Sequence, residues 1–507
     1  MSFTFVGLLQ LAIGFMLLFR SLPAMLVFVM ASGLFGGSAA LSVPALGNSS
    51  IPPIQFALIF LYLRILMPSG GQFGLLTQGI RDSFALVLFT LYGLAAAFIA
   101  PRLFAGHIEV APMRFDNARN LFDTVPLRPT AQNITAAVYM LGALLATLGT
   151  YAAVRVTGGI EALVKGSVAI AWVHALSGVI ASQTKGTPVE GFFALFRNGS
   201  YAQLDQSYQG FSRVDGFFPE ASGWASFALA WFVFNCECWY RSVWARHTGA
   251  AALAVGAVLF FSTSSTAYVG LGSYGAFFAI RALAFPASAE PVRLRQAGIT
   301  VFAIVVIAAI GLALVPGGVA RIGDMVLHMT VEKGNSDSGQ QRLFWAMQGL
   351  TAFTASGGLG VGPGSFRSSS LFMAILGTMG VVGIVTFGIY LFNVVSVIWR
   401  SPAGPQGMEG SAGPARERPR DAVRAVMEAC AVTAPLILVP AAISSPNSHP
   451  GVNFAIFAGA AMALYRMLPR PLIRPDLSLV VSRRISDAPA GASAGGAAGA
   501  SAAGWPT

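Results

Sequence analysis

Long runs of apolar residues, separated by short polar connections, follow one another along almost the whole chain. A helix crosses the hydrocarbon core of a bilayer with about 20 apolar residues. A window of that length predicts about thirteen membrane-spanning segments. Twelve or fourteen are alternatives, because the two runs that flank Ser262–Thr266 have almost no connection between them. The segments fall near 3–19, 22–41, 51–68, 84–104, 133–154, 160–182, 223–239, 248–263, 266–283, 297–315, 371–398, 427–443 and 452–467.

The apolar segments are predicted to be helices rather than strands. Unpaired backbone polar groups are not tolerated in lipid, and no ten-residue pattern of alternating polarity runs through the chain. We therefore expect an all-α polytopic membrane protein with about 12–14 transmembrane helices. The N-terminal run lacks a basic start and a small-residue cleavage site, which indicates a retained first span rather than a signal peptide.

Three connections are long, at about 105–132, 183–222 and 316–370, and several short ones are basic. Cytoplasmic loops are enriched in Lys and Arg, so the basic connections and the C-terminus are predicted to be cytoplasmic. Alternation of the spans then places all three long connections on the outer face. The basic connections are YRSVWARH at 240–247, EPVRLRQ at 290–296, the segment with Arg416, Arg418, Arg420 and Arg424, and the tail that begins MLPRPLIRP.

The composition excludes a soluble fold. Apolar types make up 55% of the residues and charged types 10%, whereas soluble domains are roughly 25% charged. The predicted outer side carries 11 basic and 10 acidic residues, a net charge of +1, while the rest of the chain carries 20 basic and 10 acidic residues, a net charge of +10. This bias supports the orientation, and it attributes the basic excess to membrane topology rather than to a nucleic-acid partner.

Residues 1–485 are predicted to form a single transmembrane helical domain, and the Ala/Gly/Ser-rich segment 486–507 a disordered cytoplasmic tail. The three cysteines cannot form a disulfide framework and are expected to be small core residues. The five histidines are far apart in the sequence, so we predict no metal site and no cofactor.

Arginine dominates the outer charges, because nine of the 11 outer cations are Arg. The guanidinium fork binds phosphate oxygens in a bidentate manner. Arg213, Arg342 and Arg367 stand near the starts of spans or beside Gly-rich turns, at the depth where a lipid-linked phosphate would lie. Arg321, in the third long connection, is a further candidate for substrate binding. The alternative is that these cations pair with the equally numerous outer acids.

The segment FSRVDGFFPEASGWASFALAWF (211–232) combines charges with the start of a span. Gly216 and Pro219 predict a turn, and Glu220 falls just before or within the first turn of the following helix. A carboxylate there is favoured by the helix dipole and is a candidate general base for a hydroxyl group. The alternative is a helix cap with Arg213 as its counter-ion.

The segment at 335–384 is the second candidate site. Arg342 precedes an amphipathic stretch that includes Trp345 and is predicted to be a helix. An amphipathic helix of this kind fits the plane of the membrane interface. A turn with several glycines follows, and these residues let a backbone approach a ligand closely. The turn is not a phosphate-binding P-loop, since it lacks Gly-Lys-Ser/Thr and a preceding strand. The substrate-binding candidates here are Trp345, Gly360, Gly362, Gly364 and Arg367.

Five Ser and Thr residues in FFSTSSTAYVGL (260–271) lie between two apolar runs. They are expected to satisfy backbone groups at a tight helical hairpin, and a functional role is the alternative.

Together these motifs resemble the O-antigen ligase and Wzy-type polysaccharide polymerase superfamily. The resemblance covers roughly residues 205–400 and rests on RVDGFFPEAS, the FSTSST hairpin, and RLFWAMQGL followed by GGLGVGPGSF, in that order. It implies a C-type glycosyltransferase-like membrane enzyme at the outer face of the bacterial inner membrane. Ser368, Ser369 and Ser370 stand where the family often shows His-Asn, which leaves the general base unidentified and favours a polymerase over a ligase.

The resemblance implies a reaction as well as a fold. A glycan would move from a polyprenyl-diphosphate carrier to a hydroxyl of a glycan acceptor, with inversion and without a metal ion. Arg213 and Arg342 would hold the diphosphate, and Glu220 matches the family's acid. Membrane lipid and a chain-length regulator are the other expected partners. The alternatives are a ligase that transfers finished glycan, and a lipid-linked oligosaccharide transporter. Transporters favour charges at midspan, and the predicted span centres carry almost none.

Overall fold

The computed structural model describes residues 2–44, 49–67, 71–113, 122–199, 207–208, 211–212, 214–284, 291–314, 337–401 and 418–468. The chain divides into the compact unit Met1–Leu468 and a second unit, Pro469–Thr507, which lies outside the described residues. The domain boundary that we predict at residue 485 therefore falls within the second unit.

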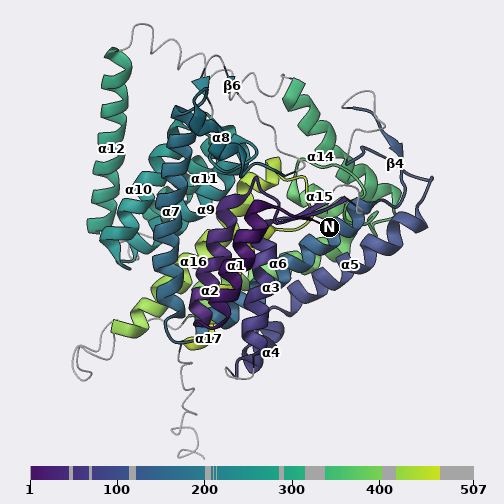
Figure 1. Ribbon diagram of the computed structural model, residues 1–507, viewed down its shortest axis with the longest axis horizontal. Helices are drawn as coiled ribbons and strands as arrows, with labels where there is room; N and C mark the ends of the chain where they lie inside the picture. The colour runs from purple at the N-terminus through teal and green to yellow at the C-terminus, as the bar shows by residue number, and fades with distance from the viewer. Residues whose placement is uncertain are drawn as a thin grey trace, which may run out of the picture. The chain divides into compact units, whose positions relative to one another are not determined.

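The first unit is all-helical, with 16 α-helices among the described residues (Figure 1). Six of them are long and apolar enough to cross a membrane, namely α5, α6, α7, α11, α15 and α16, of which α16 counts from Asp421 onward. The helices are α1 (Phe5–Leu18), α2 (Leu22–Ser32), α3 (Pro53–Leu66), α4 (Phe73–Asp82), α5 (Phe84–Leu103), α6 (Ala131–Arg155), α7 (Gly159–Gln183), α8 (Pro188–Ala194), α9 (Ala221–Tyr240), α10 (Ala245–Phe261), α11 (Ser265–Ala284), α12 (Pro291–Leu314), α14 (Asp337–Ala355), α15 (Leu371–Arg400), α16 (Arg418–Ser444) and α17 (Gly451–Met467).

Every predicted span coincides with one of these helices. The span predicted at 22–41 is the least accurate, because α2 ends at Ser32, a 3-10 turn covers Gly33–Phe35, and the chain then enters a strand at Leu41. Helix α4 lies outside the predicted spans. Its sequence is only partly apolar, so a search for long apolar runs passes over it.

Short antiparallel strands occupy the connections. β1 (Ser2–Phe3), β2 (Leu41–Val43) and β3 (Ser49–Ile51) form one sheet in that order, with Ser2 opposite Ser42 and Leu41 opposite Ile51. The pairs β4 (Glu109–Val110) with β5 (Val125–Pro126) and β6 (Ser207–Tyr208) with β7 (Phe211–Ser212) complete the set. These strands have two or three residues each and do not change the helical class.

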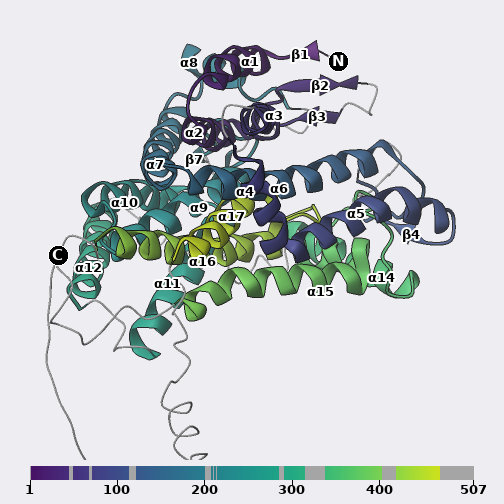
Figure 2. The ribbon, with the colours of Figure 1, turned by 90° about the horizontal axis from the view of Figure 1, so that it is seen from below.

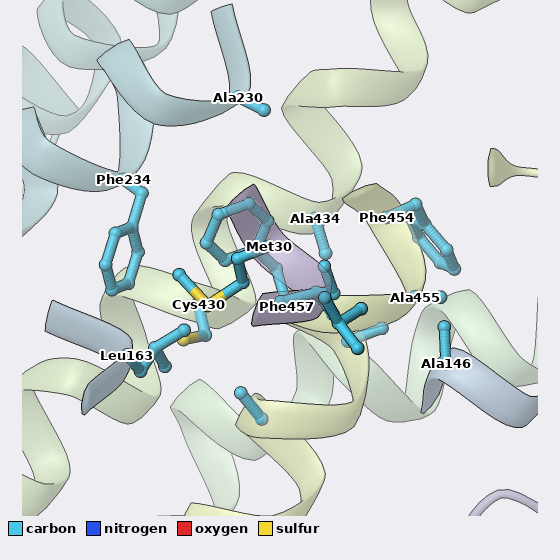
Figure 3. Close-up of a cluster of buried hydrophobic side chains, with 14 of the residues drawn as sticks. Met30, Ala146, Leu163, Ala230, Phe234, Cys430, Ala434, Phe454, Ala455 and Phe457 are labelled. Carbon is cyan, nitrogen blue, oxygen red and sulfur yellow. The ribbon is translucent and has the colours of Figure 1, made fainter. Parts of the chain in front are cut away.

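The core is built where α9, α16 and α17 pack among their neighbours. Phe234, Cys430, Phe454 and Phe457 are fully buried there together with Met30 of α2 (Figure 3). Cys430 is thus a small core residue, as expected. Close packing of α17 on α6 depends on Gly459, since a Cβ at this position would lie 2.4 Å from the backbone oxygen of Thr147.

Helix α15 is not continuous. Ser370 caps its N-terminus by accepting a hydrogen bond from the backbone N–H of Met373. Gly380 lies ten residues after this cap and has φ +58° and ψ −149°. This conformation is essentially restricted to glycine, and it breaks the helix. Helix α15 packs against α14 and against α5 (Figure 2). This break positions the loop described below.

Candidate active site

The three long connections meet at one end of the helices. The backbone N–H of Arg367 donates to the oxygen of Ala111 at 3.0 Å, which joins the third connection to the first. The N–H of Ala111 in turn donates to the side-chain oxygen of Gln348 at 3.2 Å. Glu220, at the end of the second connection, acts electrostatically on Arg367. The first and third connections are thus hydrogen-bonded to each other, and the placement of all three on the outer face stays a prediction.

Arg367 is the centre of this meeting point. Its guanidinium carbon lies 4.2 Å from the centre of the Trp345 ring, in the stacked position of a cation–π pair. Burial lowers the pKa of Arg367 from its ordinary value, and the charge of Glu220 offsets part of that fall. Trp345 and Arg367 of the third connection are therefore in contact, and Glu220 of the second connection is near enough to act on the charge of Arg367.

Arg342 belongs to the same group through α14. Arg342 and Trp345 are three residues apart, so they share one side of this helix. Ser369 lies two residues after Arg367, and its hydroxyl donates to the backbone oxygen of Arg342. The predicted helix after Arg342 is confirmed as α14. It packs closely on the N-terminal part of α15 at Gly349, because a Cβ there would lie 2.2 Å from the backbone oxygen of Met373.

Glu220 occupies the N-cap position of α9, which confirms its predicted place at the start of that span. Its backbone is extended, with φ −156° and ψ 156°, and its carboxylate makes no capping hydrogen bond. The side chain is exposed. The Glu220 carboxylate therefore does not cap α9, and it is available to a cation or a substrate.

A buried ion pair fixes the segment that leads to Glu220. Arg197 donates from Nη2 to Oδ1 of Asp215 at 2.7 Å and from Nε to the backbone oxygen of Gly216 at 3.0 Å. Lys185 lies 3.8 Å from the other oxygen of Asp215. Burial raises the pKa of Asp215, and the two cations offset part of that rise. Arg197 is thus engaged within the protein, and it orders the turn that ends at Glu220.

The glycine-rich turn approaches the protein itself. A Cβ at Gly360 would lie 2.4 Å from the backbone carbon of Thr378, at Gly362 it would lie 2.6 Å from the oxygen of Ala96, and at Gly364 it would lie 2.3 Å from the oxygen of Gln132. All three glycines have φ between +82° and +91°. We expected these glycines to let the backbone approach a ligand, and the structure shows that they let it approach α15, α5 and α6. A ligand-binding role for these three glycines stays a prediction.

The same turn fills the break in α15. The N–H of Val361 donates to the oxygen of Gly377, and the N–H of Gly362 donates to the oxygen of Thr378, both at 2.9 Å. Backbone oxygens that the break at Gly380 frees are thereby satisfied without water. This arrangement fixes the loop from which Arg367 projects.

Two predicted site residues cannot be placed. Arg213 and Arg321 lie outside the described residues. The FSTSST hairpin is described, and two of its hydroxyls donate to backbone oxygens at the end of α10. Ser262 donates to the oxygen of Leu259 at 2.7 Å, and Thr263, at φ +51°, donates to the oxygen of Ser262 at 2.8 Å. The structural expectation is met at Ser262 and Thr263, whereas the hydroxyl of Ser264 is buried without a partner.

A buried ionic cluster was missed by sequence reasoning. Glu237 of α9 is fully buried and accepts hydrogen bonds from Tyr274 at 2.8 Å and from Arg281 at 2.9 Å, both on α11. It also accepts from Arg241, whose Nε donates to Glu428 of α16 at 3.0 Å. Glu237 lies near the end of the predicted span 223–239, so the cluster does not contradict the expectation that the span centres carry almost no charge. Glu237 and Arg241 are four residues apart, and that spacing is the signal that was available.

His449 was also not selected from the sequence. It lies between α16 and α17, and its ring meets that of Tyr139 of α6 edge to face, with centroids 5.8 Å apart. Both ring nitrogens are buried without a hydrogen-bond partner. Burial lowers the pKa of His449 to about 4. Only folding brings this residue against α6.

Comparison with known proteins adds no assignment, since neither a protein-family model, nor a curated protein, nor a solved structure matches this chain. Within the part of the chain that the structure describes, no group of three or more His, Cys, Asp and Glu residues is placed to hold a metal ion.

Proposed function

We propose that this protein polymerises oligosaccharide repeat units carried on polyprenyl diphosphate, at the outer face of a bacterial inner membrane. The observation that carries the proposal is the stacking of Arg367 on Trp345, with the charge of Glu220 acting on the same guanidinium. Arg342 lies on the same side of α14 as Trp345. The resemblance to polysaccharide polymerases, drawn from the motifs around these residues, supplies the reaction class.

The chemistry of the group suits a glycosyl transfer. The acceptor hydroxyl attacks the anomeric carbon from the side opposite the diphosphate, which inverts its configuration. The bond from that carbon to the phosphate oxygen breaks, and its electron pair leaves with the diphosphate. A guanidinium such as Arg367, fixed in a partly buried site, stabilises this developing charge better than water does. Arg342 adds a second cation on the same side of α14.

Glu220 has two possible uses in this reaction. Its negative charge offsets part of the loss of basicity that burial imposes on the Arg367 guanidinium. It is also a candidate base for the acceptor hydroxyl, because it is exposed and caps no helix. Trp345 presents a flat apolar face under the cation, which limits the positions that Arg367 can adopt.

The break in α15 is the one observation that favours a transporter, because transporters use discontinuous helices to bind ions and substrates. In this chain the loop N–H groups of Val361 and Gly362 occupy the freed backbone oxygens. The break therefore serves to anchor a loop, and a polymerase remains the preferred proposal. A ligase that transfers finished glycan to another acceptor would use the same leaving-group chemistry.

The leaving-group assignment is tested with Arg342→Ala in cells that depend on this protein for surface polysaccharide. Polymer should be lost while single lipid-linked repeats persist, at an unchanged level of protein. Arg102→Ala is the matched control, because Arg102 is exposed and donates to its own helix at Phe98. Normal long-chain polysaccharide from the Arg342 variant would reject the assignment.

We further propose that the chain crosses the membrane about thirteen times, with the long connections outside and the C-terminus in the cytoplasm. A reporter fused after residue 200 or 340 should then be periplasmic, and one fused after residue 410 cytoplasmic. The opposite pattern would overturn this topology.

A further inference from the structure

The end of α9 carries a second group of polar side chains, far from the candidate active site. Helix α9 has 20 residues, so its end lies about 30 Å from Glu220 at its start. The connection Arg241–Trp244 then leads directly into α10. Val243 packs on the core, whereas Ser242 is exposed and Trp244 keeps 40% of its surface exposed. Polar and aromatic side chains of this short connection therefore face outward.

Trp244 is held in an unusual conformation. Its backbone has φ 47° and ψ 42°, the left-handed region that costs free energy for a residue with a Cβ. Its ring stacks on that of His247, with centroids 4.0 Å apart, and Nζ of Lys165 lies 5.8 Å from the ring centre. Lys165 is near the start of α7, a helix long and apolar enough to cross a membrane. Tryptophan is enriched at the headgroup level of a bilayer, and the end of a span is where that level lies.

Two arginines flank Trp239, the neighbouring tryptophan. The guanidinium carbon of Arg293, in the first turn of α12, lies 5.4 Å from the centre of the Trp239 ring, and its Nη2 donates to the hydroxyl of Ser242 at 3.0 Å. Gly249 of α10 packs on the same ring, because a Cβ there would lie 2.6 Å from Cδ1 of Trp239. Arg246 is three residues before Gly249, so it lies on the same side of α10. The two guanidiniums and the serine hydroxyl thus border one aromatic ring.

The surface formed by these residues, the basic rim, has an excess of positive charge. Among the described residues, neither Arg246 nor Arg293 forms a salt bridge, and Lys165 pairs with the exposed Glu161 of its own helix. The first turns of α10 and α12 contain no acidic residue, although the N-terminus of a helix favours negative charge. An anion from outside the protein would complement both features. The basic rim consists of Lys165, Trp239, Ser242, Trp244, Arg246 and Arg293.

We propose that the basic rim binds the phosphate headgroups of anionic phospholipids, with Arg246 and Arg293 on the phosphate and Trp244 at the boundary between headgroups and acyl chains. A guanidinium matches two phosphate oxygens with its paired N–H donors. The Ser242 hydroxyl accepts from Arg293 and keeps its own hydrogen for a phosphate oxygen.

The topology proposed above turns the basic rim toward the cytoplasmic leaflet, whose anionic lipids attract basic segments. The general enrichment of cytoplasmic loops in Lys and Arg explains the cations alone. It does not account for an exposed tryptophan held in a left-handed conformation beside them. A lipid headgroup accounts for both, because it offers a phosphate to the cations and an apolar boundary to the ring.

The test follows the thermal unfolding of the purified full-length protein in detergent as phosphatidylglycerol or phosphatidylcholine is added. A ligand that binds the folded state raises Tm, and phosphatidylglycerol should do so at a lower concentration than phosphatidylcholine, whose headgroup has no net charge. Each cation near an anionic lipid is worth about fivefold in affinity. The double variant Arg246→Gln and Arg293→Gln should therefore need about 30-fold more phosphatidylglycerol for the same rise in Tm.

A matched control removes the same charge elsewhere. Arg102 and Arg128 are two exposed arginines near the first long connection. The double variant Arg102→Gln and Arg128→Gln should keep the wild-type response to phosphatidylglycerol. An equal loss in this control would show an effect of net charge alone and would overturn the site.

Tryptophan fluorescence gives a second reading at the basic rim itself. The emission of Trp244 is the difference between the wild type and Trp244→Phe, both in phosphatidylcholine vesicles. Brominated phosphatidylglycerol should quench this emission more than brominated phosphatidylcholine does at the same mole fraction. High salt should reduce the difference, because it screens exposed charges.

Three results would overturn the inference. The first is an equal rise in Tm from the two lipids, and the second is an unchanged requirement for phosphatidylglycerol in the Arg246 and Arg293 double variant. The third is an equal effect of glycerol 3-phosphate, which lacks acyl chains and would indicate a site for a free anion. The measurement needs neither polymer synthesis nor a known orientation in the membrane, so its failure is distinct from failure of the proposed function.

Discussion

Arg367 stacks on Trp345, with 4.2 Å between the guanidinium carbon and the ring centre, although 21 residues and a glycine-rich loop separate the two in the sequence. Glu220, from a different connection, adds its charge to the same guanidinium. The stack and the carboxylate together fix a cation at a partly buried position. A fixed cation stabilises a developing anion without the reorganisation that water would need.

Replacing Arg367 should therefore reduce the rate of the chemical step. We expect Arg367→Ala to lower kcat by about 10²–10³-fold, as for other lost anion-stabilising donors. Arg367→Lys should recover only part of this loss, because a lysine keeps the charge but lacks the planar group that stacks on Trp345. Trp345→Leu should cost about tenfold or less, in line with the strength of a cation–π contact. Steady-state kinetics with a lipid-linked repeat measure all three, and equal rates for Arg and Lys would contradict the role given to the stack.

Steric packing, more than backbone conformation, should decide how the glycine loop tolerates substitution. Gly362 has φ +91° and its Cβ would collide with α5, whereas Gly357 has φ +62° and open space around it. Gly357→Ala should cost only the left-handed conformation, about 1–2 kcal/mol. Gly362→Ala adds overpacking and should cost more than about 3 kcal/mol in total. Thermal unfolding of the purified variants checks this order, and a more stable Gly362→Ala than Gly357→Ala would disprove the packing of the loop.

The Glu237 cluster should contribute strongly to stability. Glu237→Gln removes the buried counter-charge of Arg281 and leaves Arg241 paired with Glu428 alone, and breaking such a buried pair costs about 3–5 kcal/mol. Glu161→Gln is the matched control, because Glu161 pairs with Lys165 on the exposed start of α7 and should leave Tm unchanged. The measurement is Tm in one detergent. A Tm for Glu237→Gln equal to that of the control would show that the ion pairs of Glu237 do not stabilise the folded protein.

Acid should destabilise the fold through His449. Its folded pKa of about 4 lies below the ordinary value of 6.5, so the unfolded chain binds the proton more tightly. The stability due to the neutral ring is present above about pH 6.5 and is lost as pH falls toward 4. Linkage gives a change of about 3 kcal/mol across this window. His449→Gln removes this contribution, so the stability of wild type minus variant, measured by unfolding at several pH values, should fall with acid. A difference independent of pH would contradict the burial of His449.

The helices could be predicted from the sequence because each apolar run carries its own signal. All thirteen predicted spans coincide with helices, from Phe5–Leu18 to Gly451–Met467. Helix α4 was missed because it is short and only partly apolar. The place of Glu220 at the start of α9 was predicted correctly, since Gly216 and Pro219 mark the turn before an apolar run.

The contacts within the site were beyond the sequence. Nothing local to Gly362 tells whether its missing side chain makes room for a ligand or for α5. Likewise, the burial of Glu237 depends on Tyr274 and Arg281, which come from another helix. The burial of His449 follows from long-range folding as well, which places its ring against Tyr139. Long-range packing decides these cases, and a pattern along one chain does not contain it.

The most direct measurement is the conversion of a purified polyprenyl-diphosphate-linked repeat by the purified protein in lipid vesicles, with products separated by length. The account predicts a ladder of longer lipid-linked glycans from the wild-type protein and from Arg102→Ala. It predicts only the starting repeat from Arg367→Ala and from Arg342→Ala. A ladder of the same length and rate from these two variants, or no product longer than the substrate from the wild type, would contradict it.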